Sequence, residues 1–270
     1  MGINKESTGF TFLFAIVMVV VVGAILAIAA MGLKPFQDEN IRQEKMKNIL
    51  MAIKVMDMSS DMAAAPDLFE QHVKERILLD VKGEVVSTKS GSIDRTDMLD
   101  AFNIDIKKEY KTYVKPVLSK YKKDPEKCLD ELCKLSEVHY PLFKCEKEGK
   151  SYYVIPMTGT GLWGPIWGFM GIEDDMETVY AAVFDHKTET PGLGAEINQK
   201  AFQKGFEGEK IFDEAGNYAP IAVVKGGADP ADLHGVDAIT GGTLTSNGVG
   251  EMLARTIRFY VPYLKNNKKQ

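Results

Sequence analysis

The sequence predicts an α+β domain that follows a single membrane-spanning helix. Residues 10–33 contain no charged side chain, and about 20 consecutive apolar residues are enough to cross a bilayer as a helix. In the second half of the chain, short β-rich runs alternate with amphipathic helical patterns, which favours helices packed against a twisted, mostly antiparallel sheet. With 270 residues, the chain is long enough for one sizeable domain and an anchor.

The apolar segment 10–33 is interpreted as a retained anchor, because it exceeds the apolar core of about 7–15 residues in a cleaved signal peptide. Lys34-Pro35 also follows it without a clear small-residue cleavage site. The segment holds no ionisable residue, so we expect it to anchor the protein without forming an ion path. The chain then divides into an N-terminal tail (1–9), the span (10–33), a domain (34–265) with its motifs in 151–264, and a basic tail (266–270). The basic run 265–269 is interpreted as a disordered end.

The charge pattern gives clearer information about the partners of the protein than about its membrane topology. A net charge of −5 argues against a nucleic-acid partner, which normally requires a basic face. Lys5 precedes the span, whereas Lys34, Arg42, Lys45 and Lys47 follow it, and this count places the domain on the cytoplasmic side. Long domains cross membranes regardless of such charges, so the count alone does not decide the topology.

Periodicity then predicts the elements in chain order. We expect helices over 39–58 and 66–79, a strand around Val85 and Val86 with Gly91 in a turn, and a surface helix or insertion over 121–134. Farther on, we expect strands over 151–157, 178–184 and 221–225, and helices over 195–206 and 246–264.

The chain has three cysteines, Cys128, Cys133 and Cys145. Three are too few for a disulfide framework, and no histidine lies at zinc-like spacing from them, so no metal site is expected. One bridge between Cys128 and Cys133 would form in an oxidising compartment, and unpaired cysteines are the equally acceptable alternative.

A glycine-rich stretch at 159–164, G-T-G-L-W-G, formally matches the dinucleotide fingerprint. That fingerprint requires a helix to open within its glycines, and Pro165, Gly168 and Gly171 argue against a long helix there. We therefore reject direct NAD binding. The stretch also holds the first of the only two tryptophans, Trp163 and Trp167, which either wall an apolar site for a planar ring or fill a core.

The stretch 237–249, D-A-I-T-G-G-T-L-T-S-N-G-V, has the chemistry of a phosphate-holding turn. Gly241 and Gly242 lie among hydroxyl residues, and an amphipathic helical pattern follows directly. Glycines let the backbone approach an anion, and the first N–H groups of a helix are unpaired donors at its positive end. The alternative is ordinary capping of that helix by Thr245 or Ser246.

Other polar clusters do not indicate catalysis. His186 and His234 lack a cysteine, or a serine and an aspartate, in a nucleophilic arrangement. The acidic run 173–175 is interpreted as a solvated turn in preference to a cation site. We therefore expect no catalytic acid, base or nucleophile on this chain.

The stretch 237–249 resembles the flavinylation motif of the FMN-binding domain family. This family is shared by the NqrC component of the Na+-translocating NADH:quinone oxidoreductase and the RnfG component of the Rnf electron-transport complex. The resemblance makes Thr243 the residue whose hydroxyl forms a phosphoester with FMN. Carried over to this sequence, the motif residues and their immediate neighbours are Asp237, Thr240, Gly241, Gly242, Leu244 and Thr245. Gly242 departs from the family, which usually has alanine there; because only a methyl group is missing, we expect the attachment to survive.

Two further motifs resemble the same family, in the same order along the chain. Leu162 and Trp163 match its G-x-G-L-W segment, and this pair favours NqrC over RnfG. Residues 189–194, E-T-P-G-L-G, match a loop that packs on the flavin, and Thr-Pro-Gly is by itself a turn signal. The resemblance makes Glu189, Thr190, Leu193 and Gly194 candidate flavin contacts, with Thr190 as a hydrogen-bonding residue and Leu193 as an apolar wall.

The resemblance implies an electron carrier of a bacterial inner membrane, with its domain on the periplasmic side. FMN held covalently would relay electrons between an iron–sulfur centre and the next flavin. Other membrane subunits would oxidise NADH, reduce the quinone and move Na+, and a separate flavin transferase would attach the FMN.

Three alternatives predict different observations. The RnfG component would co-purify with a different set of subunits. A membrane-anchored binding protein without a cofactor would be colourless. An enzyme that uses this flavin on a small molecule would need a substrate pocket.

Overall fold

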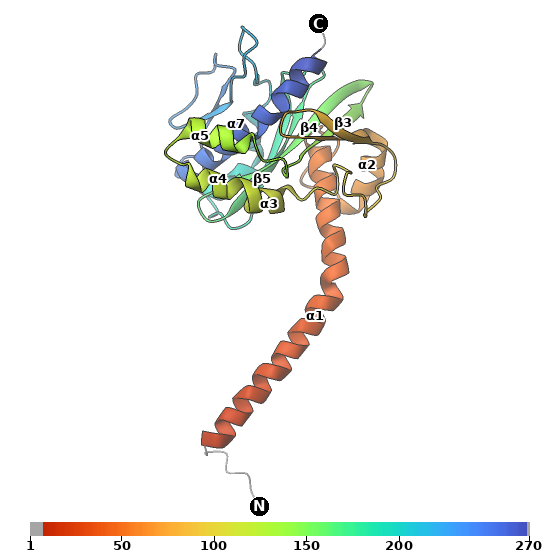
Figure 1. Cartoon of the computed structure of the whole chain (residues 1–270), viewed down its shortest axis with the longest axis vertical. Helices are drawn as coiled ribbons and strands as arrows, with labels where there is room; N and C mark the ends of the chain where they lie inside the picture. Colours follow the sequence, from red (N-terminus) through yellow and green to blue (C-terminus); the bar gives the residue numbers. More distant parts are fainter. Residues whose placement is uncertain (1–7, 269–270) are drawn as a thin grey trace, which may run out of the picture. The chain divides into compact units, whose positions relative to one another are not determined.

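The computed structural model describes residues 8–268 (Figure 1). The helices are α1 (Thr8–Met51), η1 (Met62–Ala64), α2 (Ala65–His72), α3 (Ile106–Glu109), η2 (Tyr110–Val114), α4 (Lys115–Lys120), α5 (Pro125–Leu132), η3 (Gly194–Asn198), α6 (Lys200–Lys204) and α7 (Thr243–Asn267). The strands are β1 (Val73–Leu79), β2 (Val85–Lys89), β3 (Tyr140–Lys147), β4 (Lys150–Thr160), β5 (Pro165–Ile172), β6 (Val179–His186), β7 (Ala222–Val224) and β8 (Gly235–Asp237).

The N-terminal unit, residues 1–45, contains most of the long helix α1. By length and composition α1 is able to cross a membrane, with an 18-residue window of mean hydropathy 3.1. The sequence predicted two helices, over 10–33 and 39–58, whereas one helix of 44 residues continues through Pro35. It ends at Met51, seven residues before the predicted end, and Lys54 then adopts a positive φ of 54°.

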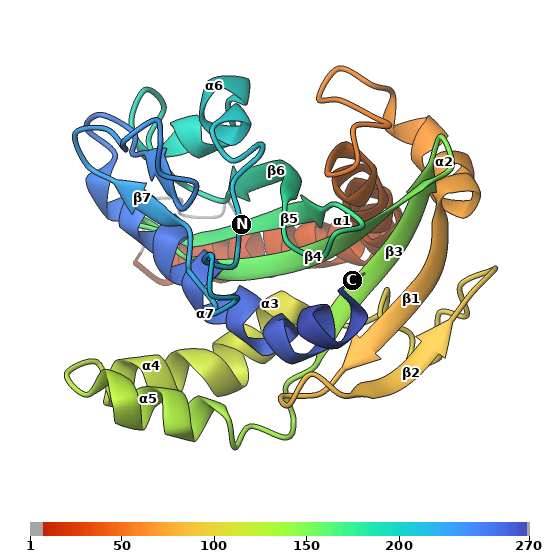
Figure 2. The same ribbon diagram turned by 90° about the horizontal axis from the view of Figure 1, so that it is seen from above.

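The second unit, residues 46–270, is built on a six-stranded antiparallel sheet in the order β2-β1-β3-β4-β5-β6. Figure 2 shows the twist of this sheet, with the C-terminal helix α7 running across one face. Side chains alternate between the two faces of a strand, so both faces are apolar. On β4, Tyr153 and Ile155 join the core under α7, and Tyr152 and Val154 join the core on the opposite face. The predicted α+β class with a twisted antiparallel sheet is confirmed.

Each face of the sheet is covered by a different helix. Val249, Leu253 and Ile257 of α7 are fully buried against one face. On the other face, Ile49 and Leu50 at the end of α1 are fully buried in the second core, beside residues of α2. The sheet and α7 together fix the hairpins and loops at one end of the domain.

One predicted element differs from the structure in the first half of this unit. The predicted helix 66–79 ends at His72, and its second half is strand β1, which pairs with β2 and β3. The run V-K-E-R-I-L-L is compatible locally with the periodicity of a helix and with that of a strand. Pairing with β3, which is distant in the sequence, stabilises the strand. The strands β3, β5 and β8 were not predicted, whereas β2, β4, β6 and β7 lie close to the predicted positions.

The structure also describes the three cysteines and the C-terminal end of α7, for which the sequence made predictions. Cys128, Cys133 and Cys145 are all free thiols, so the structure has no bridge between Cys128 and Cys133. The run 265–269 was predicted as a disordered end, whereas α7 includes its first residues and extends to Asn267. Residues 1–7 of the predicted N-terminal tail and residues 269–270 lie outside the described residues.

Candidate functional site

Three segments that are far apart in sequence meet at one end of the domain. The first is the hairpin that joins β4 to β5, in which Gly161 N–H donates to Gly164 O (2.8 Å). The second is the loop that connects β6 to η3, and the third is the turn that enters α7. These are the segments that carry the G-L-W, E-T-P-G-L-G and T-G-G-T motifs of the sequence.

Glu189 joins all three segments through its carboxylate, and the residue is only 5% exposed. The backbone N–H of Trp163 donates to Glu189 Oε1 (2.8 Å), and the hydroxyl of Thr245 donates to Glu189 Oε2 (2.6 Å). Both oxygens of a buried carboxylate are therefore satisfied, one by the hairpin and one by the first turn of α7. Glu189 therefore positions the hairpin relative to the start of α7, and its predicted contact with the flavin stays a prediction.

Two motif glycines make room for this carboxylate. A Cβ on Gly161 would lie 2.5 Å from Glu189 Oε1, and a Cβ on Gly194 would lie 2.5 Å from Glu189 Oε2. A side chain at either position would push the carboxylate away from its donors. The glycines of the hairpin and of the E-T-P-G-L-G loop thus permit close packing around Glu189, which sequence reasoning did not assign to them.

The turn into α7 is formed by the glycine pair. Gly241 has a φ of +78°, which favours glycine, and Gly242 is the residue before the first helical position. Helix α7 begins at Thr243, three residues before the predicted start, and no side chain caps its first turn. Capping by Thr245 or Ser246, the alternative left open by the sequence, is therefore wrong.

The hydroxyl residues of this turn divide into two groups. Thr245 and Ser246 are fully buried and engaged, since Thr245 donates to Glu189 and Ser246 Oγ accepts from Ile239 N–H (3.1 Å). Thr240 is exposed in the loop before the glycine pair, and Thr243 is half-buried at the first helical position. Thr243 alone combines an accessible hydroxyl with a place beside the unpaired N–H groups of the helix start.

Four large apolar side chains stay exposed on these same segments. Leu162 is 49% exposed, Trp163 66%, Leu193 43% and Leu244 60%. The loop and the turn into α7 touch one another, because a Cβ on Gly241 would lie 2.6 Å from Leu193 Cδ2. Exposed apolar side chains that gather beside glycines and helix N–H groups mark a site for a ligand with a planar apolar part and an anionic part.

Other predicted site residues have different partners. Asp237 Oδ1 accepts from the backbone N–H of Ala228 (2.7 Å), so this acid holds the loop before β8. Thr190 is exposed, and its carbonyl accepts from the N–H groups of Leu193 and Ala195 (both 3.1 Å), which forms the predicted turn. Trp167 packs on the opposite core, with Lys107 Nζ 3.2 Å from its ring centroid, so only Trp163 of the two tryptophans is placed to wall the site.

Two residues that sequence reasoning left out of the site support it. His186 Nδ1 accepts from the N–H of Glu189 (3.2 Å), and Thr188 Oγ1 donates to the carbonyl of Trp163 (3.1 Å). Both lie at or just after the end of β6, next to Glu189 in the sequence. Their proximity to the E-T-P-G-L-G loop is the signal that would have placed them here.

The geometry agrees with the similarity of this chain to known proteins. The FMN-binding domain family matches residues 161–258, which include the hairpin, the loop and the start of α7. The chain is 31% identical to the NqrC protein of the Na(+)-translocating NADH-quinone reductase of Neisseria meningitidis serogroup A over 269 residues, or 98% of this chain and 96% of the relative. The chain belongs to the NqrC family of Na(+)-translocating NADH-quinone reductase subunits.

The chain is also similar in sequence and in structure to other members of the NqrC family. The protein of Pseudomonas aeruginosa is 31% identical over 256 residues, which cover 93% of this chain and 91% of the relative. The crystal structure of the family member from Parabacteroides distasonis superposes with a TM-score of 0.67 and 33% identity, over 86% of this chain and 96% of that chain. The crystal structure of the Shewanella oneidensis NqrC protein superposes with a TM-score of 0.61 and 25% identity, over 83% of this chain and 98% of that chain. The preference of the Leu162-Trp163 pair for NqrC over RnfG is thereby confirmed.

Proposed function

We propose that this protein is the electron-carrying NqrC component of a Na+-translocating NADH–quinone reductase, and that its FMN is joined by a phosphoester to Oγ1 of Thr243. The assignment of Thr243 is supported by the different environments of the hydroxyl groups at the start of α7. Thr245 and Ser246 are buried and hydrogen-bonded, whereas Thr243 is half-buried with an accessible hydroxyl. Attachment at Thr243 leaves the buried contacts of the turn intact.

The residues present fit both halves of FMN. The start of α7 would hold the phosphate, because Gly241 and Gly242 let the backbone come close and the helix dipole favours an anion. The apolar side chains of Leu162, Trp163 and Leu193 offer walls for a planar ring system. When bound, FMN supplies reversible electron transfer, while the protein supplies binding, orientation and shielding.

The chain's own residues hold the cofactor in one orientation. Glu189 fixes the hairpin that carries Trp163 to the first turn of α7 that carries Thr243, because it hydrogen-bonds to both segments. A fixed distance between the phosphate anchor and the aromatic wall limits the positions that the ring can adopt. No proton transfer by a side chain is needed to pass single electrons, and the site accordingly assigns no acid or base.

The finer features of the assembly also belong to this proposal. The domain lies on the periplasmic side of a bacterial inner membrane, anchored by the apolar part of α1, although the basic residues after the span favour the opposite side. A separate flavin transferase attaches the cofactor. Sibling membrane subunits oxidise NADH, reduce the quinone and move Na+.

Isosteric substitution of the hydroxyl tests the attachment. The full-length chain, produced together with a flavin transferase, should carry flavin fluorescence that survives acid denaturation and electrophoresis. Thr243→Val should abolish this fluorescence, because valine has the shape of threonine without its oxygen, whereas Thr240→Val should retain it. Retained fluorescence in the Thr243→Val protein would overturn the assignment.

A further inference from the structure

The helices α3 to α5 form a basic surface on an acidic protein. Residues 106–127, the lysine-rich segment, contain three acidic residues and no arginine. They hold eight lysines: Lys107, Lys108, Lys111, Lys115, Lys120, Lys122, Lys123 and Lys127. The segment therefore has a net charge of +5, whereas that of the whole protein is −5. Figures 1 and 2 show its helices together on one side of the domain, beside α7.

Two of the three carboxylates in this segment are engaged by groups other than the lysine ammonium groups. Glu109 Oε2 accepts from the backbone N–H of His139 (2.9 Å), and Glu109 Oε1 lies 2.9 Å from His139 Nδ1. Asp124 accepts from the backbone N–H of Lys127 at the start of α5 (3.1 Å). Four of the lysine side chains are exposed to solvent and free of these contacts: Lys111, Lys115, Lys122 and Lys123. The positive charge of the segment is therefore available to an external anion.

Apolar and aromatic side chains accompany these lysines. A groove of about 720 Å³ lies between α4, α5 and α7, and Lys115 and Lys122 line it together with Leu118 and Leu129. Tyr113, on the same segment, is 37% exposed. Lysine and tyrosine side chains combine an apolar body with a polar tip, so they suit the boundary between water and hydrocarbon. The surface thus has both parts that are needed to contact an anionic amphiphile.

The composition of the segment favours a lipid over a protein as its partner. Interfaces between proteins are enriched in arginine and depleted in lysine. Clusters of four to eight basic residues close to a membrane-spanning helix are, by contrast, typical of surfaces that bind anionic lipid headgroups. The segment has eight lysines and no arginine. Its charge therefore matches the many equivalent phosphates of a bilayer surface better than a specific protein interface.

The membrane anchor keeps this surface within reach of a bilayer. Residues 34–45 connect the predicted span 10–33 to the domain, which begins at Met46. Twelve residues reach at most about 40 Å, even if they are fully extended. A short connection of this kind raises the effective concentration of headgroups at the domain, so individually weak attractions are sufficient for binding.

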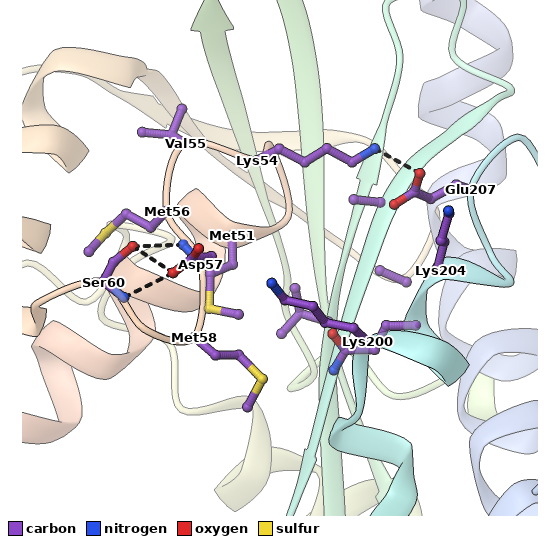
Figure 3. A pocket seen from close by; sticks show the side chains of 14 residues that line it. Met51, Lys54, Val55, Met56, Asp57, Met58, Ser60, Lys200, Lys204 and Glu207 are labelled. Atoms are coloured by element: carbon purple, nitrogen blue, oxygen red, sulfur yellow. Dashed lines mark hydrogen bonds and ion pairs between the residues drawn. The ribbon is translucent and has the colours of Figure 1, made fainter.

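A second group of lysines differs from the lysine-rich segment. Lys54, Lys200 and Lys204 line a cavity of about 420 Å³ (Figure 3). Carboxylates lie among them, since Lys54 is 2.9 Å from Glu207 and Asp57 lines the same cavity. Lys200 and Lys204 are exposed on α6. They therefore provide a matched control for exposed lysines outside the lysine-rich segment.

We propose that the lysine-rich segment binds anionic phospholipid headgroups of the membrane in which α1 is anchored. The phosphates lie against Lys115 and Lys122, and this contact restricts the orientation of the domain relative to the bilayer. The inference rests on the proposed membrane anchor and goes beyond the proposed electron carrier, because Leu162 and Trp163 of the flavin site are not among the described residues that line the groove. The rival partner is an acidic face of a neighbouring subunit.

Energy transfer in reconstituted membranes tests the proposal. The full-length chain is labelled with a red-emitting fluorophore on Cys133, which is exposed directly after α5, whereas Cys128 and Cys145 are buried. It is inserted into nanodiscs with an acceptor on the headgroups, made of phosphatidylcholine alone or of equal parts of phosphatidylcholine and phosphatidylglycerol. Phosphatidylglycerol should raise the ratio of acceptor to donor emission about twofold, because the anionic surface attracts the segment. High salt should remove this increase by screening.

Charge reversal separates the lysine-rich segment from the rest of the surface. Lys115→Glu combined with Lys122→Glu should abolish the increase caused by phosphatidylglycerol. The control, Lys200→Glu combined with Lys204→Glu, changes the net charge equally and should retain the increase. Melting temperatures show whether both variants are folded, and the salt titration of the unsubstituted protein tests the proposal without them.

Three results would overturn the proposal. These are an emission ratio that phosphatidylglycerol does not change, an increase that survives high salt, or an equal loss in the two double variants. An acidic protein partner predicts no increase, because no other subunit is present in the nanodiscs. Acid-stable flavin fluorescence of the same samples reports the cofactor, so a lipid effect without bound flavin would contradict the proposed function alone.

Discussion

The hydroxyl of Thr245 donates a 2.6 Å hydrogen bond to Glu189, 56 residues earlier in the chain. Glu189 also accepts from the backbone N–H of Trp163 at 2.8 Å. A single buried carboxylate therefore ties the aromatic hairpin to the helix turn that carries Thr243, and the geometry of the site depends on it.

Removing the Glu189 carboxylate should loosen the site. Glu189→Ala leaves two buried donors without an acceptor, and we expect a loss of about 3 kcal/mol in the free energy of unfolding, since each such hydrogen bond to a charged group contributes about 1.5–3 kcal/mol. Flavin attachment should also fall. Glu189→Gln is the matched control: its carbonyl oxygen can accept from Trp163 while its amide donates to Thr245, so about 1 kcal/mol should be lost. Urea denaturation compares the two, and equal stability of both variants would show that Glu189 has no such role.

The two glycines before α7 should respond differently to alanine. A Cβ on Gly241 would lie 2.6 Å from Leu193 Cδ2 at a φ of +78°, so Gly241→Ala should distort the turn and reduce flavin attachment several-fold. A Cβ on Gly242 would lie 3.0 Å from Ile239 Cγ2 and 3.2 Å from the backbone oxygen of Leu193, so shifts of a few tenths of an ångström in these neighbours would accommodate it, and its φ is not in the left-handed region. Gly242→Ala, which restores the usual family residue, should keep full attachment in the in-gel fluorescence assay. The reverse order of these two effects would contradict the geometry.

Two glycines within α7 form a second matched pair. A Cβ on Gly248 would collide with the carbonyl of Thr160 at the end of β4, so Gly248→Ala should cost about 1–3 kcal/mol by overpacking. A Cβ on Gly250 meets its nearest atoms at 3.8 Å, an ordinary contact. Gly250→Ala should stabilise the protein by about 0.5–1 kcal/mol through its higher helix propensity. Thermal unfolding should show a lower melting temperature for Gly248→Ala and a higher one for Gly250→Ala than for the unsubstituted protein.

Thiol reactivity should differ among the three cysteines. Burial raises the pKa of the Cys128 thiol and, more strongly, that of Cys145, whereas Cys133 is exposed. Because the thiolate is the reactive form, a maleimide at neutral pH should label Cys133 alone in the native protein. Unfolding in guanidinium without reductant should then expose three reactive thiols. One thiol after unfolding would instead indicate a bridge between Cys128 and Cys133.

The sequence predicted the parts of the fold that depend on local periodicity. The strands over 151–157 and 178–184 were found because aromatic and β-branched residues lie between clear turn signals, and β4 and β6 occupy these positions. Strand β5 was missed because it begins with a proline and contains Gly168 and Gly171. These glycines are needed because Phe184 and the carbonyl of Ala52 pack against the strand there, and such tertiary contacts leave no local periodic signal.

The candidate site was predicted residue by residue from its motifs, but its internal connections were not. The order of the motifs indicated that the hairpin, the loop and the start of α7 belong to one site. The sequence did not distinguish Thr243 from Thr245 by chemistry, because both are threonines within one turn. Only the packing of Glu189 against Thr245 separates the engaged hydroxyl from the accessible one.

Mass spectrometry of the purified full-length protein measures the attachment most directly. After digestion, fragmentation of the peptide that contains Thr240, Thr243, Thr245 and Ser246 should place the mass of FMN less one water on Thr243 alone. An unmodified peptide from a host that possesses the flavin transferase, or the same added mass on another residue, would contradict the proposed attachment.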